Sequence, residues 1–292
     1  FFSGGVDSFF TVLRHNNISS SDRQIDIDDL LLVWGFDIPL RNRDAFARIR
    51  ERLRRAASDL GKELIAVSTN VGAALIRRTD WPFLSLGCGL ASVALAMEKR
   101  YSRALIASGH GYENLTPWGS HPLTDPLLST SRTRIIHDGA AFSRVEKMQF
   151  IAGSDVAMRS LHVCWVLQSD ENCSACNKCY RTMTTLALLG ALPRCTTFKE
   201  GSVDEKKIPR IYSRGGNDRF FLRQVRDLAL RKGRRDIAIA IDRSIRYSRR
   251  FDKRQPVVKW FERNRLGWIL DAARKLRQIE DVSLFRGKAR DA

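Results

Sequence analysis

The chain has 292 residues, 43% hydrophobic and 28% charged, enough for one large domain or for a domain of about 200 residues with an appendage. No apolar run approaches the roughly 20 residues that cross a bilayer, and no secretory signal is visible, which excludes a transmembrane helix. The net charge is +18, and residues 205–292 carry +15 of it, with 26 Lys or Arg against 11 Asp or Glu. This asymmetry separates a nearly neutral body from a basic tail.

Residues 1–200 alternate short apolar runs with amphipathic helices, the pattern of a parallel α/β sheet. Phe1-Phe2 is predicted to end a first strand, which we expect to begin before residue 1. Four further strands are predicted at residues 30–36, 63–68, 103–108 and 161–166. Helices are predicted at residues 7–15, 42–60, 84–99, 143–152 and 182–189. We therefore expect a parallel five-stranded sheet with helices on both faces.

The stretch 110–138 has no clear period and is rich in Gly, Pro, Ser and Thr. Loops of this length inside a compact domain are usually functional or disordered. His121 and Asp125 are candidate catalytic residues that contact the substrate or a metal. The alternative is a hydrogen-bonded loop histidine and an aspartate that caps a helix. The segment from Tyr112 to Asp125, which includes Trp118, is predicted to decide the substrate.

Basic helices follow after about residue 199, at residues 218–232, 235–249 and 256–279. We therefore predict a domain over residues 1–200 and a basic helical extension over residues 201–292. Aromatic residues interleaved with arginine could stack on RNA bases while the arginines bind phosphates. An acidic partner or membrane surface for the extension, and a solvated amphipathic bundle without a ligand, are the alternatives.

The strongest local signal is Ser3-Gly4-Gly5-Val6-Asp7-Ser8, between a strand end and a helix start. Glycine allows backbone angles closed to other residues, and consecutive N–H groups at a helix N-terminus bind phosphate oxygens. The loop lacks the GK[ST] ending of a Walker loop. A tight turn without a ligand is the alternative. Asp7 either holds Mg²⁺ through water or caps the helix.

The S-G-G-x-D-S pattern resembles the signature of the PP-loop ATP pyrophosphatases. The resemblance implies a Rossmann-like fold that cleaves ATP between the α- and β-phosphates, with the loop holding pyrophosphate. Gly4, Gly5 and Ser8 would then contact pyrophosphate, with Ser3 at the loop entrance. Two strand ends are expected at the same crevice, because parallel sheets bind ligands at the carboxyl ends of their strands. They carry the remaining candidates for nucleotide binding: Phe36, Ser108 and Gly109.

A second signal is the spacing Cys164-x8-Cys173-x2-Cys176-x2-Cys179. Cysteines this close favour a metal site in a reducing compartment over a disulfide framework, so we expect a cytoplasmic protein. Four thiolates suit a structural Zn²⁺, whose charge Lys178 and Arg181 would partly offset. An iron–sulfur cluster and free cysteines are the alternatives.

Together the two motifs resemble 7-cyano-7-deazaguanine synthase and its relatives, over residues 1 to about 192. The resemblance implies zinc ligands at Cys164, Cys173, Cys176 and Cys179, and it places Arg144-Val145-Glu146-Lys147 at a family K-x-E segment. The family has Gly where Ser174 stands here. It also implies adenylation of a small-molecule or macromolecular acceptor, at a carboxylate or carbonyl oxygen, followed by attack of ammonia or an amine.

Two other functions remain open. One is a tRNA-modifying PP-loop enzyme that binds RNA through its basic tail. The other is an interaction protein with a regulatory ATP site. A homodimer is compatible with every one of these hypotheses.

Overall fold

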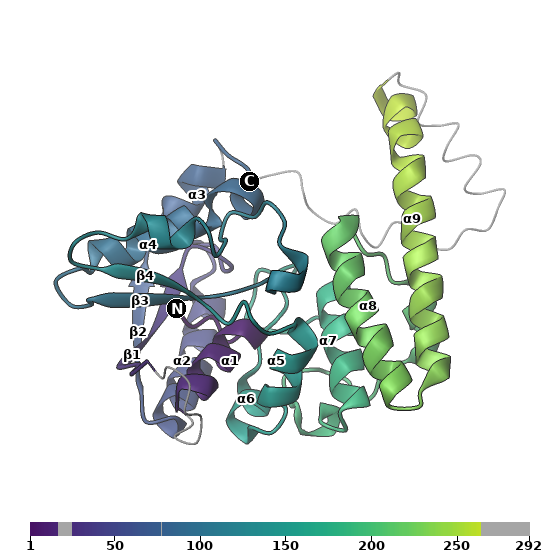
Figure 1. The fold of residues 1–292 in the computed structure, drawn as a ribbon, viewed down its shortest axis with the longest axis horizontal. Helices are drawn as coiled ribbons and strands as arrows, with labels where there is room; N and C mark the ends of the chain where they lie inside the picture. Colours follow the sequence, from purple (N-terminus) through teal and green to yellow (C-terminus); the bar gives the residue numbers. More distant parts are fainter. Residues whose placement is uncertain (17–24, 77, 264–292) are drawn as a thin grey trace.

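The computed structural model describes residues 1–16, 25–76 and 78–263, and it shows a mixed α/β fold (Figure 1). The helices and strands are α1 (Val6–Asn16), β1 (Asp29–Trp34), α2 (Arg43–Asp59), β2 (Glu63–Ser68), α3 (Val71–Ile76), α4 (Leu86–Ala96), β3 (Arg103–Ala107), β4 (Arg134–Asp138), α5 (Arg144–Ile151), α6 (Asp155–Ser160), α7 (Asn177–Leu188), α8 (Gly215–Arg231) and α9 (Arg235–Arg263). Figure 1 shows the strands with α1 to α4 in one half and α8 and α9 in the other.

The strands form two parallel pairs in the described part of the chain. β1 pairs with β2 from Asp29 opposite Glu63, and β3 pairs with β4 from Arg103 opposite Arg134. Phe1-Phe2 lies between the pairs, because the Phe2 N–H donates to the Leu31 carbonyl at 2.8 Å and the Phe1 amino group donates to the Leu105 carbonyl at 2.9 Å. Both pairs are parallel, as predicted, but β4 falls in a stretch where no element was predicted.

The predicted five-stranded sheet is not present among these residues. Neither Phe1-Phe2 nor residues 161–166 are a strand, although residues 161–164 are buried. The N–H groups of Val163 and Cys164 donate to the side-chain oxygen of Asn172 at 2.9 and 3.1 Å. Because a side chain takes these donors, the segment lacks the backbone pairing that defines a strand.

Helix α2 illustrates how local sequence sets the helices. Its N-cap residue Asn42 accepts a hydrogen bond from the Ala45 N–H, and its buried residues recur at helical spacing through Phe46, Ile49 and Leu53. At α5, Ser143 and Glu146 form a capping box. These caps satisfy N–H groups that the first helical turn would leave without partners.

The residues after 200 pack against the rest of the chain through a second apolar core. It joins Val145 of α5 and Tyr180 of α7 to Leu222 and Val225 of α8 and to Ile241 of α9. Helix α9 is continuous where two helices were predicted at 235–249 and 256–279, and residues 264–279 lie outside the described residues. Among residues 1–16, 25–76 and 78–263, no helix combines the length and apolarity that crossing a bilayer requires.

Candidate nucleotide and metal site

The glycine loop forms a tight turn into α1. Gly4 has φ +77°, and a Cβ there would lie 2.8 Å from the Leu53 Cδ2 atom. The Ser8 hydroxyl donates to the Gly5 carbonyl at 3.0 Å, and the Gly5 N–H donates to the Ser3 hydroxyl at 3.4 Å. Of the two glycines, Gly4 is therefore the one whose backbone and surroundings require the absence of a side chain.

A cavity of about 240 Å³ opens beside this loop. It brings together five of the predicted nucleotide-binding residues: Ser3, Gly5, Asp7, Ser8 and Phe36. Gly4, Ser108 and Gly109 do not line it. Basic side chains that were not predicted to bind nucleotide, Arg144 and Lys178, do line it, together with Cys164. The cavity therefore adjoins both predicted motifs.

Asp7 pairs with two cations at the edge of the cavity. Its carboxylate lies 2.9 Å from Arg144 Nη2 and 3.5 Å from Lys147 Nζ. Burial opposes ionisation of Asp7, but the charges of Arg144, Lys147 and Lys178 outweigh it and lower the pKa of the carboxyl group. Asp7 therefore carries its negative charge in a strongly positive neighbourhood.

Lys147 and Lys178 are unusual because burial lowers the pKa of both ammonium groups. Lys147 is 2% exposed, and its ammonium donates to the Ser108 carbonyl at 2.6 Å. Arg144 Nη2 donates to the Gly109 carbonyl at 3.2 Å. Ser108 and Gly109 thus contact the basic side chains instead of lining the cavity. Burial also lowers the pKa of Arg181 to about 10.

The structure does not bring His121 and Asp125 to the cavity. Asp125 is fully buried, and its carboxylate accepts hydrogen bonds from the Ser120 hydroxyl at 2.6 Å and the His121 N–H at 3.0 Å. It also lies 2.7 Å from His137 Nδ1. The His121 Nδ1 atom accepts from the Leu123 N–H at 3.2 Å. These contacts hold a loop together, so a direct catalytic role stays a prediction without support from them.

The four predicted cysteine ligands converge on one point. The Sγ atoms of Cys164, Cys173, Cys176 and Cys179 all lie within 4.8 Å of one another, and those of Cys173 and Cys179 lie 3.7 Å apart. A tetrahedral zinc ion with Zn–S bonds of about 2.3 Å requires sulfur atoms about 3.8 Å apart. The cluster could therefore hold a metal ion such as zinc.

Backbone groups already orient the cysteines. The Cys176 N–H donates to the Cys173 sulfur at 3.2 Å, and the Cys179 N–H donates to the Cys176 sulfur at 3.5 Å. Such N–H···S bonds favour thiolates, the form that binds metal. Ser174 has φ +54°, a left-handed conformation that favours glycine, in the turn between Cys173 and Cys176.

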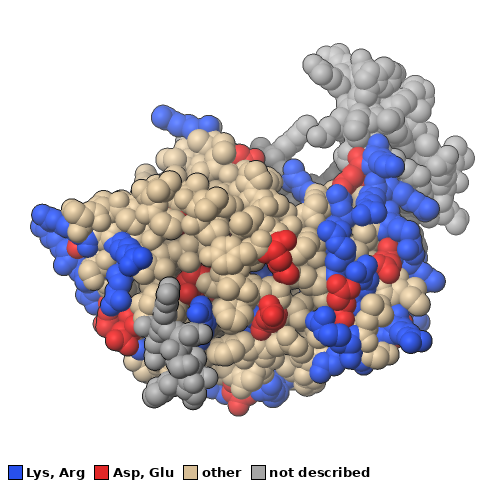
Figure 2. Space-filling view, viewed as in Figure 1, with Lys and Arg blue, Asp and Glu red and all other residues tan. Residues whose placement is uncertain are grey.

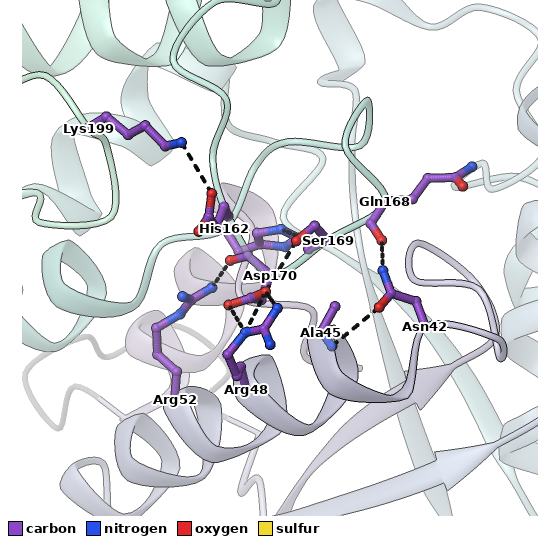
Figure 3. A network of polar contacts seen from close by, with 10 residues as sticks. Asn42, Ala45, Arg48, Arg52, His162, Gln168, Ser169, Asp170 and Lys199 are labelled. Carbon is purple, nitrogen blue, oxygen red and sulfur yellow. Dashed lines mark hydrogen bonds and ion pairs between the residues drawn. The ribbon is translucent and has the colours of Figure 1, made fainter. Parts of the chain in front are cut away.

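Asn172 links the cluster to the cavity wall. Its side chain is 1% exposed, and besides the two N–H groups named above it contacts the Leu161 carbonyl at 2.9 Å and the Thr197 hydroxyl at 3.1 Å. The residues just before Asn172 contact α2 and its N-cap, as Figure 3 shows: Arg48 pairs with Asp170 at 2.9 Å, and the Asn42 amide donates to the Gln168 carbonyl at 3.0 Å.

One further bond joins the glycine loop to the segment that carries Cys164. The His162 N–H donates to the Gly4 carbonyl at 2.7 Å, and His162 Nε2 lies 2.9 Å from the Ser169 carbonyl oxygen (Figure 3). The loop and the cysteine cluster are therefore parts of one connected unit.

Sequence reasoning missed the contribution of the basic side chains to the cavity. Arg144 and Lys147 are three residues apart on α5 and therefore share a helix face, which is a readable signal. Nothing local indicates that this face meets Asp7, more than 130 positions earlier in the chain.

The chain has no match among protein-family models, curated proteins or solved structures.

Proposed function

We propose that the chain is an ATP-consuming enzyme of the PP-loop ATP pyrophosphatase type. It cleaves ATP between the α- and β-phosphates, releases pyrophosphate, and activates a carboxylate or carbonyl oxygen of an acceptor as an adenylate. Ammonia or an amine then displaces AMP. The observation that carries this proposal is the cavity beside the glycine loop, lined by Ser3, Gly5 and Ser8 and by the cations Arg144 and Lys178.

The cations and hydrogen-bond donors at this cavity could bind a polyphosphate. Hydroxyl and backbone N–H donors at the start of α1 bind phosphate oxygens, and positive side chains stabilise the charge that develops on leaving pyrophosphate. Burial strengthens these interactions because the local dielectric constant is lower than that of water. Asp7 orders Arg144 and Lys147 so that both face the loop from a fixed direction.

Magnesium fits less well at Asp7 than the sequence suggested. Asp7 is already paired with two cations, and among the described residues that line the cavity the other carboxylate is the exposed Asp37. We therefore assign Asp7 to ordering the cations. Mg²⁺ would enter with the triphosphate of ATP, whose oxygens are ligands that it prefers.

Zinc is the metal that we propose for the cysteine cluster. Four sulfur ligands would fill the tetrahedral shell of zinc and leave no open position, so the ion would stabilise the fold and take no part in the reaction. An iron–sulfur cluster places several ions inside its cysteine ligands and needs more room than one zinc ion. The bound ion would hold Cys164 in the cavity wall.

Product analysis tests the enzymatic proposal. The protein is incubated with ATP, Mg²⁺ and a small-molecule extract of cells that supplies the acceptor, and the products are separated. We expect AMP and pyrophosphate, and ADP with phosphate would contradict the mechanism. Arg144→Gln should lose turnover, whereas the matched control Arg159→Gln should keep it, because Arg159 is an exposed surface residue paired with Asp59.

RNA binding is the second candidate function, and one observation favours it. Figure 2 shows Lys and Arg side chains gathered over α8 and α9. Exposed basic residues on α9 form no ion pair with any residue that the structure describes; they are Arg243, Arg246, Arg249, Arg250 and Lys253. Such a surface attracts phosphates at low salt. A high ratio of absorbance at 260 nm to that at 280 nm in purified protein would support this function, and RNA-free protein that binds no tRNA would refute it.

A further inference from the structure

Phe221 of α8 contacts two arginines, one of which, Arg144, pairs with Asp7 of the glycine loop. Its ring is 7% exposed, and its centroid lies 5.2 Å from the Arg144 guanidinium carbon and 4.7 Å from that of Arg181. Both distances are within the range of cation–π attraction. Because the two guanidiniums come from α5 and α7, one aromatic side chain of the C-terminal extension connects two helices of the preceding region.

Each arginine has a further partner that fixes its direction. Arg144 pairs with Asp7 of the glycine loop at 2.9 Å. Arg181 pairs with Asp218 of α8 at 3.4 Å, and Asp218 also accepts a hydrogen bond from the Asn177 amide at 2.9 Å. The two cations repel each other, and contact of both with one aromatic ring offsets part of that repulsion without neutralising either charge.

Helix α8 is itself held firmly in place. Leu222 and Val225 belong to the second apolar core together with Val145, which follows Arg144 directly. The His110 ring stacks on Phe221 with centroids 5.4 Å apart, so the loop that follows β3 also contacts the same ring. Phe221 therefore has little freedom to move away from the arginines.

We propose that Phe221 is a positioning residue for the nucleotide site: it holds Arg144 in the orientation that pairs with Asp7 and faces the cavity. The C-terminal extension then completes the site instead of merely following it. This inference rests on the proposed nucleotide-binding function. Phe221 itself does not line the cavity, so it acts through the arginine.

The experiment measures ATP affinity by calorimetry in the full chain. Phe221→Leu removes the ring while keeping an apolar side chain, and Phe220→Leu is the matched control. Phe220 is the neighbouring aromatic residue, and its cation partner is Arg223, at 5.8 Å. A second series replaces Phe221 with phenylalanine carrying one, two or three fluorine atoms. Fluorine weakens the negative face of the ring but nearly preserves its shape, so this series remains informative where the leucine variant does not fold.

We expect Phe221→Leu to weaken ATP binding about 3- to 30-fold, the range of a partly buried cation–π contact. Affinity should fall stepwise along the fluorinated series while the melting temperature changes little, and Phe220→Leu should bind ATP as the wild type does. Wild-type affinity across the fluorinated series would overturn the positioning role and leave the proposed function intact. A wild-type protein that binds no ATP would overturn both.

Discussion

His110 should make the stability of the protein depend on pH in a way that one substitution removes. The ring lies between two aromatic side chains, with centroids 4.9 Å from Trp118 and 5.4 Å from Phe221. Its Nε2 atom is buried and has no hydrogen-bond partner among the described residues. Burial, and next the positive charge of Arg144, lower the pKa of His110 from 6.5 to about 4.

Protonation of His110 favours the unfolded chain. Between pH 6.5 and pH 4 the unfolded chain takes up a proton at His110 that the folded protein resists, so the free energy of unfolding falls as the pH falls. One pH unit corresponds to about 1.4 kcal/mol for a fully shifted group. Allowing for partial exposure of the ring to solvent, we expect His110 to lower the free energy of unfolding by about 1–2 kcal/mol at pH 5 relative to pH 7.

His110→Phe keeps an aromatic ring between Trp118 and Phe221 and removes the titration. Urea unfolding of wild type and variant at pH 7, 6 and 5 gives the difference in their free energies of unfolding. Contributions common to both proteins, including those of the cysteine cluster, cancel in that difference. The free energy of unfolding of the variant should rise relative to that of the wild type as the pH falls. A difference that is constant from pH 7 to pH 5 would refute the burial of a neutral imidazole.

Three further predictions concern the metal, the loop and the buried amide. Elemental analysis should find about one zinc per chain, and Cys176→Ser should lose both the metal and thermal stability because zinc binding is coupled to folding; iron with visible absorbance would contradict this. Gly4→Ala should lower the free energy of unfolding by about 2 kcal/mol, because residue 4 has a left-handed backbone and a Cβ there would lie close to Leu53. Gly5→Ala should have a smaller effect, and equal melting temperatures of the two variants would contradict this prediction. Asn172→Ala should lower the free energy of unfolding in urea by about 3–4 kcal/mol, because it leaves buried backbone groups without partners. A decrease below about 1 kcal/mol would show that water replaces the amide.

The strands that the sequence predicted correctly are apolar runs whose backbone groups pair with another run. The runs that became β1, β2 and β3 are of this kind, although β2 contains no fully buried residue. Residues 161–166 are as apolar, but the N–H groups of Val163 and Cys164 bond to the Asn172 side chain. An apolar run does not report which group accepts its backbone hydrogen bonds, so the two cases look alike in sequence.

The site was predictable where its parts are consecutive in sequence. The glycine loop and the cysteine spacing each reveal themselves within a few residues. The Arg144–Asp7 pair and the Phe221 contact join distant positions, and no local pattern reports such contacts. His121 and Asp125 lie in a polar loop that the sequence marks as functional, but the loop's own side chain–backbone contacts occupy the Asp125 carboxylate, and the substrate-contacting role stays a prediction.

The hydrogen bond from His162 to Gly4 has a consequence for how the two ligands would influence each other. His162 lies two positions before Cys164, so a metal ion that ordered the cysteine would also order the backbone that contacts the glycine loop. Thermodynamic linkage is reciprocal: if metal raises the affinity for nucleotide by some factor, nucleotide raises the affinity for metal by the same factor. A chain depleted of metal would then bind ATP more weakly, and saturating ATP would slow the loss of metal to a chelator.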